Sequence, residues 1–425
     1  MGTVIAAPQH GADVYLTINH YLQAIAEEEI AKAVKNAGGA SGWAIMMDPN
    51  TGEIFTWAQY PYFELSSYRT YFNDPKLQPN TIAKAITDPY EPGSIMKPLT
   101  LAIGLKANLE QNKRGKPPVF SPQDKVATTI GNFPGRGKPL KDLHTHKFLN
   151  FQLGLQKSSN VYMAKLVQKV TESLGDAWYR QALADLFGFG QKTGIELPAE
   201  SAGLLPRPGK LHPNGKLEWS KATPYSLAMG HNVLANSLQM LRAYGVLASG
   251  GYEVTPHLVR KSVRTQEDGT EEVIADHTVA AANKRRLLEP EIVKEVTAAM
   301  RFVTKPGGTA SKANIPGYTE AGKTGTSEKI VGGVYSKRNH ISTFIGYAPA
   351  TDPRFVLLIA IDEPEMKYIP GLGKNQQAGV CCAPAFREIG QRALEYLGVP
   401  KDDSDNKAWD EEVKKLKTLY DQWNH

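Results

Sequence analysis

Apolar residues recur at helical spacing near the start of the chain. Leu22, Ile25, Ile30 and Val34 fall on one face of a helix, so the pattern predicts a helix over residues 21–37. Similar periodic stretches follow through the middle of the chain, separated by loops rich in Gly and Pro. They predict further helices at 94–107, 160–172, 177–186, 237–248, 289–303 and 384–397.

Strand patterns lie at the two ends of the chain. Residues 43–47 and 54–57 flank a turn rich in Pro, Asn and Gly, which predicts a hairpin. Near the other end, residues 323–330, 341–348 and 355–361 predict an antiparallel meander. We therefore expect a mixed α/β (α+β) fold with a central antiparallel sheet that joins both ends of the chain. Helices should flank this sheet, and the middle of the chain should form a mostly helical subdomain.

Two segments differ from this core. Residues 113–141 are basic and rich in Gly and Pro, and we expect them to form an excursion from the core. After a polar stretch at 401–406, apolar residues recur every three or four positions and predict an amphipathic helix. This helix either packs back on its own domain or offers a surface to a partner. Its apolar residues are Trp409, Val413, Leu416, Tyr420 and Trp423.

The composition excludes several classes of protein. With 425 residues, 41% of them hydrophobic and 22% charged, the chain has the balance of a globular protein rather than a disordered one. Its longest strongly apolar run, 355–361, is far shorter than the roughly 20 residues that cross a bilayer. The net charge of +6 is modest and the basic cluster 284–286 fits a solvated helix entrance, so we expect no nucleic acid partner. Cys381 and Cys382 are adjacent and cannot join distant segments.

Candidate chemistry begins at Ser94, which is followed by Lys97 at the start of a predicted helix. Residues three apart share a helix face, so the hydroxyl and the amine lie within reach of each other. A serine becomes a nucleophile when a base takes its proton, and lysine can be that base if its pKa falls from about 10.4 towards 7. The pattern is weak alone, because Ser404 and Lys407 repeat it in the polar tail.

A second motif, Ser158 and Asn160, stands ahead of an amphipathic helix. Its two side chains either face a substrate together or simply cap the helix. Ser404 and Asn406 repeat this pattern in the tail, so it is weak by itself too.

A third motif combines Lys323 with Thr324, Gly325 and Thr326. Small residues beside a lysine let a substrate backbone lie along the strand, and the lysine would supply a positive field. A second copy at 192–194 is flanked by Gly and Pro and reads as a loop. We therefore select Lys323, which heads a strand at the expected edge of the sheet.

Each motif is weak, but their order is specific. Ser94, Ser158 and Lys323 follow one another at a helix start, a loop and an edge strand, as in the penicillin-binding proteins and class A β-lactamases. From about residue 14 to 397 the sequence resembles the class B penicillin-binding proteins, and most of all their division-specific FtsI type. The segments that carry the resemblance are Tyr90-Glu91-Pro92-Gly93-Ser94, Phe187-Gly188-Phe189-Gly190, Thr193-Gly194-Ile195-Glu196-Leu197-Pro198, Gly322-Lys323-Thr324-Gly325-Thr326 and Phe344-Ile345-Gly346-Tyr347-Ala348-Pro349.

This resemblance implies a penicillin-binding, serine β-lactamase-like transpeptidase fold and a peptidoglycan D,D-transpeptidase activity. Ser94 would attack the D-Ala-D-Ala bond of a stem peptide, and Lys97 would be the general base. Ser158 and Lys323 would help carry the proton to the departing D-alanine, while Asn160 would hold the peptide carbonyl. The backbone N–H groups of Ser94 and Thr326 would form the oxyanion hole, and the side chains that would bind the terminal carboxylate are Thr324 and Thr326, beside Gly325.

The resemblance also implies a biological setting. Residues 1–13 would be a linker from an absent stalk, 14–400 the transpeptidase domain and 401–425 a helical tail. The partners would be stem peptides, as acyl donor and amine acceptor, and β-lactams bound covalently to Ser94. A membrane glycosyltransferase and division proteins would bind through an absent N-terminal region, which would anchor the protein at the extracytoplasmic face of the bacterial cytoplasmic membrane. No cofactor or metal is expected.

Several rival functions differ in the fate of the acyl-enzyme. A class A β-lactamase places a glutamate three residues before a Leu-Asn pair, but Leu149-Asn150 is preceded at that spacing by His146. A D,D-carboxypeptidase would transfer the acyl group to water, and a β-lactam sensor would keep it. An elongation-type class B transpeptidase is a further alternative to the division type. A zinc site at His144 and His146 lacks other ligands at metal spacing, so a solvated loop pair is favoured.

Overall fold

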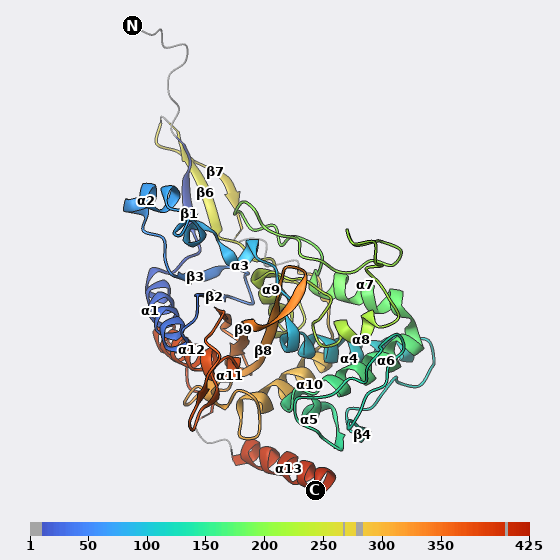
Figure 1. The fold of residues 1–425 in the computed structure, drawn as a ribbon. Coiled ribbons are helices and arrows are strands. Elements are labelled where there is room, and N and C mark those ends of the chain that lie inside the picture. Colours follow the sequence, from blue (N-terminus) through green and yellow to red (C-terminus); the bar gives the residue numbers. More distant parts are fainter. Residues whose placement is uncertain (1–10, 267, 278–283, 404–406) are drawn as a thin grey trace.

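A five-stranded antiparallel sheet forms the centre of the molecule, in the order β3-β2-β10-β9-β8 (Figure 1). Leu358 of β10 pairs with Ile45 of β2 on one side and with Ile345 of β9 on the other. Strands from the two ends of the chain therefore meet, which confirms the predicted sheet. The strands are β2 (Ser41–Met47), β3 (Ile54–Tyr60), β8 (Ala321–Val331), β9 (Val334–Ala348) and β10 (Phe355–Asp362).

The structure is a computed structural model and describes most of the chain. The described residues are 11–266, 268–277, 284–403 and 407–425. Ser404 and Asn406, which belong to the repeated motifs in the polar tail, lie outside the described residues.

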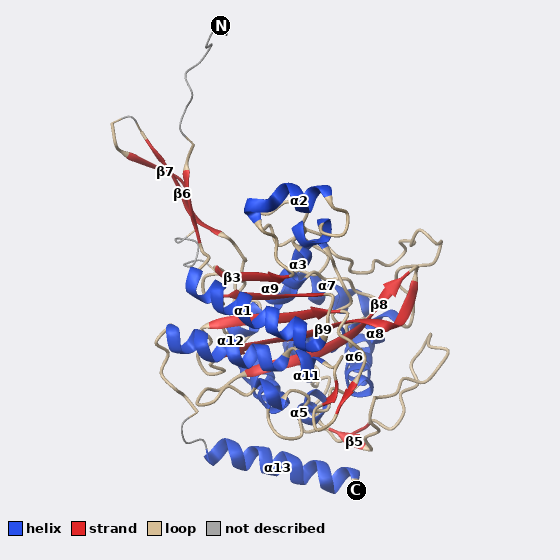
Figure 2. Cartoon of the chain, turned by 60° about the vertical axis from the view of Figure 1, so that its left-hand side comes forward, coloured by secondary structure: helices blue, strands red, loops and turns tan. Residues whose placement is uncertain are grey.

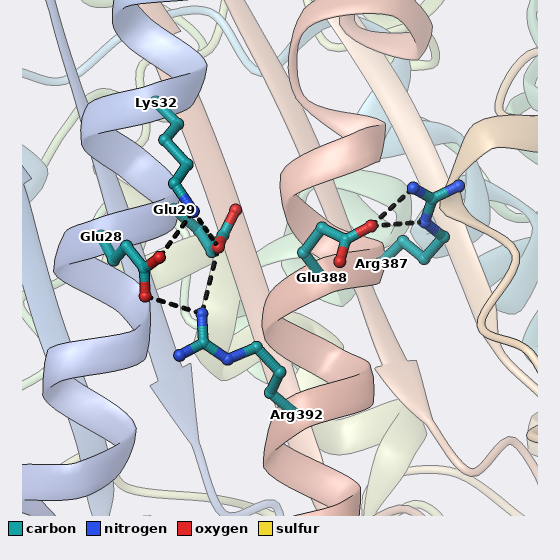
Figure 3. Close-up of polar contacts among 6 residues, drawn as sticks. All are labelled: Glu28, Glu29, Lys32, Arg387, Glu388 and Arg392. Atoms are coloured by element: carbon teal, nitrogen blue, oxygen red, sulfur yellow. Dashed lines mark hydrogen bonds and ion pairs between the residues drawn. The ribbon is translucent and has the colours of Figure 1, made fainter.

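Helices cover both faces of the central sheet (Figure 2). On one face α1 (His20–Ala37) contacts β2 and β3, and α12 (Ala383–Tyr396) contacts β10. These two helices lie side by side and are joined by ion pairs from Arg392 to Glu28 and Glu29, at 2.9 and 3.1 Å (Figure 3). The opposite face carries α9 (Ser237–Ala248) and α10 (Pro290–Arg301), both predicted from the sequence.

The middle of the chain folds into the predicted helical subdomain. The helix expected over 94–107 divides into a 3-10 turn, η3 (Gly93–Met96), and a longer helix, α4 (Lys97–Lys113). Leu99, Leu101 and Ile103 of α4 have no exposed surface, so this helix forms the centre of the subdomain. Around it lie α5 (Phe151–Gln156), α6 (Asn160–Leu174), α7 (Asp176–Phe187) and α8 (Thr223–Leu227).

A three-stranded sheet that the sequence did not predict projects from the body of the molecule (Figures 1 and 2). Its strands are β1 (Asp13–Leu16), β6 (Val259–Thr265) and β7 (Glu271–Asp276), with β6 in the middle. Val263 is its only residue with a buried side chain among the described positions. Because its side chains are almost all exposed or partly exposed, its strands have no clear apolar alternation. The sequence pattern therefore did not predict them.

The basic segment 113–141 is mostly loop and returns to the helical subdomain. A short strand within it, β4 (Val126–Ala127), pairs with β5 (Phe148–Leu149). Phe133 and Leu140 are buried in a small apolar cluster with Val161 of α6. Shorter elements elsewhere are η1 (Leu65–Ser67), α2 (Tyr68–Asn73), η2 (Gln78–Thr81), α3 (Lys84–Thr87), η5 (Phe302–Thr304), η6 (Ser311–Ala313), β11 (Tyr368–Ile369), β12 (Gly373–Lys374) and α11 (Ala378–Cys381).

The C-terminal helix α13 (Lys407–Asn424) packs back on its own domain, beneath the helical subdomain (Figure 1). Its apolar face is the predicted one: Leu416 is buried and the ring of Trp409 lies 4.6 Å from that of Phe302, centroid to centroid. Neither α13 nor any other helix in the described part of the chain is apolar enough over sufficient length to span a membrane. The two cysteines, Cys381 and Cys382, are both free and buried.

We expect Leu416→Ala to speed proteolytic removal of α13. The truncation leaves a gap under the helix and costs about 2 kcal/mol of its docking free energy, which is roughly a thirtyfold larger opened population. Limited proteolysis followed by mass spectrometry measures this rate. The exposed Thr418→Ala is the matched control, and equal cleavage of the two variants would contradict the docked position of α13.

Candidate active site

Ser94 lies on a tight turn that is held by hydrogen bonds with Gly230 and with helix α9. The preceding Gly93 has φ of 58°, and its N–H donates to the carbonyl of Gly230 at 3.1 Å. The Tyr244 hydroxyl donates to the carbonyl of Ile95 at 2.7 Å from helix α9. These bonds hold the turn so that Ser94 opens onto a cleft rather than onto the core.

The edge strand β8 passes very close to this turn. A Cβ atom added at Gly325 would lie 2.9 Å from the carbonyl oxygen of Pro92 and 3.0 Å from Ile95 Cγ2. The first distance is shorter than real Cβ atoms show, and it is to a backbone atom, so only glycine permits this approach. The glycine of the third motif therefore brings Thr324 and Thr326 to the turn that carries Ser94.

Lys97 is fully buried and contacts the second motif. Its Nζ donates to the Ser158 carbonyl at 2.5 Å and to the Ser158 Oγ at 3.0 Å. Burial lowers the pKa of Lys97 to about 7, although the negative charge of Asp142 acts in the opposite direction. At neutral pH a large fraction of this amine is therefore unprotonated and able to accept a proton.

In the second motif, different residues cap the helix and contact Lys97. Ser159, and not Ser158, is the N-cap of α6, because its Oγ accepts the N–H of Tyr162 at 3.0 Å. Ser158 has φ of 55°, a left-handed conformation that turns it toward Lys97. Asn160 begins α6 and lines the cleft.

Asp142 supports this motif, and sequence reasoning missed it. Its carboxylate accepts from the Ser159 hydroxyl at 2.5 Å and from the backbone N–H of Asn160 and Val161 at 2.6 and 3.0 Å. These bonds fix the start of α6 beside Lys97. No local signal marks Asp142, because it follows the basic segment 113–141 and reaches α6 only in the folded chain.

Lys323 of β8 lies fully buried beneath the cleft. Its Nζ donates to the Thr324 carbonyl at 3.0 Å and to the Thr324 Oγ1 at 3.3 Å. Burial, and secondly the charge of Lys97, hold the pKa of Lys323 well below its usual value. Both causes act against a positive charge on this amine.

The motifs meet at one cavity of about 550 Å³. Lys97 and Lys323 lie behind its wall, and the other six expected residues line it: Ser94, Ser158, Asn160, Thr324, Gly325 and Thr326. Sequence reasoning missed Thr309, whose hydroxyl bonds that of Thr324 at 2.8 Å, and the exposed Glu328, which follows the third motif on β8.

Glu91 is a further residue to which the sequence analysis assigned no role. Its carboxylate accepts from His231 Nδ1 at 2.8 Å, from the Asn232 N–H at 2.8 Å and from the Tyr335 hydroxyl at 2.9 Å. Tyr335 belongs to β9, so Glu91 ties the β8–β9 hairpin to the turn that carries Ser94.

The repeated patterns elsewhere have structural roles. The Thr193 N–H and hydroxyl bond the Glu200 carboxylate at 2.7 and 2.8 Å, which confirms that the copy at 192–194 is a loop. Asn150 caps α5, and His146 bonds the Tyr420 hydroxyl through Nδ1 at 2.9 Å. Within the described ranges no group of three His, Cys, Asp or Glu side chains is placed to hold a metal ion.

Residues 42–389 match the family described as "Penicillin binding protein transpeptidase domain". The chain belongs to this family. It is 29% identical over 397 residues to a protein named probable peptidoglycan D,D-transpeptidase PenA of Neisseria gonorrhoeae, across 92% of this chain and 58% of that one. It is 30% identical over 397 residues to peptidoglycan D,D-transpeptidase FtsI of Buchnera aphidicola, across 93% and 60%. The chain thus spans about three fifths of the length of these two relatives.

Solved structures of the same penicillin-binding family share this fold. Penicillin binding protein 3 of Mycobacterium tuberculosis, complexed with aztreonam, has a TM-score of 0.76 at 27% identity, covering 94% of this chain and 83% of that one. The transpeptidase domain of penicillin-binding protein 3 from Burkholderia pseudomallei has a TM-score of 0.68 at 26% identity, covering 91% and 97%. The expected class B resemblance and fold class are confirmed.

We expect Lys97 to titrate near pH 7 in this transpeptidase cleft, protonated below that pH and neutral above it. Asp142→Asn should move the titration to lower pH, because it removes the negative charge that favours the protonated amine. NMR of isotope-labelled lysine, with Lys97→Met to assign the signal, measures both values. Asp410→Asn on the exposed side of α13 should leave the titration unchanged, and a midpoint near the ordinary value of about 10.4 would contradict the buried environment.

Proposed function

We propose that this chain is a peptidoglycan D,D-transpeptidase that works through an acyl-enzyme on Ser94. The observation that carries the proposal is the bond from the buried Lys97 amine to Ser158, at a cleft that Ser94 and Thr326 also line. A base with a pKa of about 7 beside a serine on a helix turn suits acyl transfer at neutral pH. The names of the relatives point to the same substrate class.

Acylation breaks the bond between the last two D-alanines of a stem peptide. The Ser94 Oγ attacks the carbonyl carbon while the neutral Lys97 takes the hydroxyl proton. The proton then passes through Ser158 to the amine of the departing D-alanine, which leaves as the ester forms. Backbone N–H groups of Ser94 and Thr326 would stabilise the oxyanion, and Asn160 would hold the peptide amide.

Substrate binding would also favour the charged form of Lys323. The hydroxyls of Thr324 and Thr326 face the cleft and can bind the terminal carboxylate of the stem peptide. A carboxylate beside Lys323 would raise the pKa of that buried amine and favour its protonated form. In this scheme the substrate strengthens the positive field that Lys323 supplies.

The acyl group then passes to an amine of a second stem peptide. The amine attacks the ester carbonyl, its proton moves by way of Lys97 to the Ser94 Oγ, and the new amide closes a cross-link. β-Lactams would enter the same first step and stop at the ester. Among the described residues Glu328 is the carboxylate that lines the cleft, and it is solvent-exposed. Both oxygens of Asp142 are taken up by α6, so neither carboxylate is a positioned base for water.

We place this activity in septal wall synthesis, by likeness to the relative named FtsI. The protein would act outside the bacterial cytoplasmic membrane. It would work with a membrane glycosyltransferase and division proteins through a region N-terminal to this domain.

Benzylpenicillin should label the chain one to one, and the adduct should persist for many minutes. Deacylation is slow because water lacks a positioned base, whereas acylation uses Lys97 and the oxyanion donors. Intact-mass spectrometry over time measures both steps, and Ser94→Ala should remove the adduct.

Two further outcomes separate the rival functions. A stem-peptide thioester should transfer to an amino-acid amide, whereas a sensor would keep its adduct without transfer. Loss of the penicillin adduct within seconds, with hydrolysed drug accumulating, would make the protein a β-lactamase. A labelled peptide containing Ser404 in place of Ser94 would overturn the choice of nucleophile.

Lys323→Ala should slow acylation by about 10²-fold, because the carboxylate of the ligand loses a cation beside Thr324. Lys192→Ala, in the second Lys-Thr-Gly copy, is the matched control and should change the rate less than twofold, since its loop is bonded to Glu200 instead. Stopped-flow labelling with a fluorescent penicillin measures the rates. A larger effect at Lys192 would show that the wrong copy was chosen.

A further inference from the structure

The walls of the cleft include two segments that are far apart in the sequence. One, here the Ser158 segment, is residues 156–160 and carries Ser158 and Asn160. The other, here the Thr309 segment, is residues 302–310 and carries Thr309, whose hydroxyl bonds Thr324 at 2.8 Å. The distance between these segments therefore influences the distance between the proton relay and the carboxylate-binding threonines.

Lys157 joins the two segments directly. It is half-buried, lines the cleft next to Ser158, and its Nζ donates to the carbonyl of Gly307 at 2.9 Å. The neighbouring Gln156 is buried and its Nε2 lies 3.5 Å from the carbonyl of Phe302. Of these two bonds, the one from Lys157 is shorter and lies at the cleft.

The C-terminal helix α13 contacts both segments from outside the cleft. Near its start, Trp409 packs on Phe302, and Arg301 lies 3.9 Å above the Trp409 ring. Near its end, the Lys157 ammonium lies 4.3 Å from the centroid of the Tyr420 ring. A single rigid helix thus spans the Ser158 and Thr309 segments on the side away from the substrate.

The Tyr420 ring is itself held in place. Its hydroxyl bonds His146 Nδ1 at 2.9 Å, and its backbone carbonyl accepts from Asn424 Nδ2 at 2.9 Å. Asn424 Oδ1 in turn accepts the N–H of Lys147 at 2.7 Å. A ring that is fixed at both its hydroxyl and its backbone limits the positions open to the cation above it. The lysine is thereby directed to Gly307 rather than into solvent.

We propose that Lys157 and Tyr420 are positioning residues for acylation, in which the ring of Tyr420 directs Lys157 to Gly307 and this bridge sets the width of the cleft between Ser158 and Thr324. The inference rests on the proposed acyl transfer at Ser94. It gives α13 a part in the reaction although the helix touches neither the substrate nor the nucleophile. Misplacing reacting groups slows a reaction strongly even when binding is retained, so the effect should fall on the chemical step.

Full-length variants test the bridge through the rate of acylation by a fluorescent penicillin. Tyr420→Ala and Lys157→Met should each lower the limiting first-order rate about three- to fivefold, the scale of one partly exposed cation–π contact, with little change in the half-saturating concentration. Tyr420→Phe keeps the ring and should retain most of the rate, and Lys157→Arg should restore much of it. The double variant should be no slower than the slower single variant, because both changes break one bridge.

Trp423→Ala is the matched control on the same helix. Trp423 also packs under a lysine, with Lys125 Nζ 5.3 Å from its ring centroid, but that lysine does not line the cleft. This variant should acylate at the wild-type rate even if it loosens α13. Equal slowing by Trp423→Ala and Tyr420→Ala, or additive losses in the double variant, would overturn the proposal.

Hydrogen exchange separates this inference from the proposed function. Tyr420→Ala should raise amide exchange in residues 157–160 and 303–310 more than Trp423→Ala does, whether or not the protein reacts with penicillin. If the wild-type protein forms no adduct, this result contradicts the proposed Ser94 chemistry. Hydrogen exchange then tests the bridge between Lys157 and Gly307 by itself. Unchanged exchange in both segments would overturn the bridge even if acylation proceeds as proposed.

Discussion

Two lysine side chains share a space beneath the cleft that water does not reach. Lys97 and Lys323 have no exposed surface, and burial lowers the pKa of each. Two positive charges in a low-dielectric interior repel strongly, so the fold is more stable when at least one of the two amines is neutral. A neutral amine is also what a general base requires. The same burial therefore costs folding free energy at neutral pH, because both amines would be charged in the unfolded chain, but it prepares the chemistry.

The burial of Lys97 has a clear origin in the helix that carries it. α4 is surrounded by the helical subdomain, and Leu99, Ala102 and Ile103 have no exposed surface. Such a helix cannot be moved to tune one side chain without disturbing the whole subdomain. Adjustable parts of the site instead come from loops and strand edges: Asp142, the Ser158 segment and the β8–β9 hairpin tied to Glu91. These parts are held by hydrogen bonds rather than by close packing.

Much of the fold follows from local pattern, and much of the site does not. The helix over 160–172 and the hairpin near residue 50 were predictable because periodicity and turn residues act over short distances. Ser94 and Lys97 were predictable for the same reason, since one turn of helix joins them. Asp142 and Thr309 were not, because each reaches the site from a distant loop. The charge of Lys323 depends on its neighbours in three dimensions, which sequence spacing does not contain.

The order of strands in the sheet has a consequence for how the protein reaches its native state. β8, β9 and β10 are consecutive and can pair early, but β10 must also pair with β2, which lies near the other end of the chain. Closing such a long loop costs entropy before the contacts compensate it, so this pairing should be a slow step in folding. The turn with Ser94 lies on the connection that this step closes. Assembly of the Ser94 cleft should therefore be a late event on the folding pathway, and an intact cleft signals that the sheet is complete.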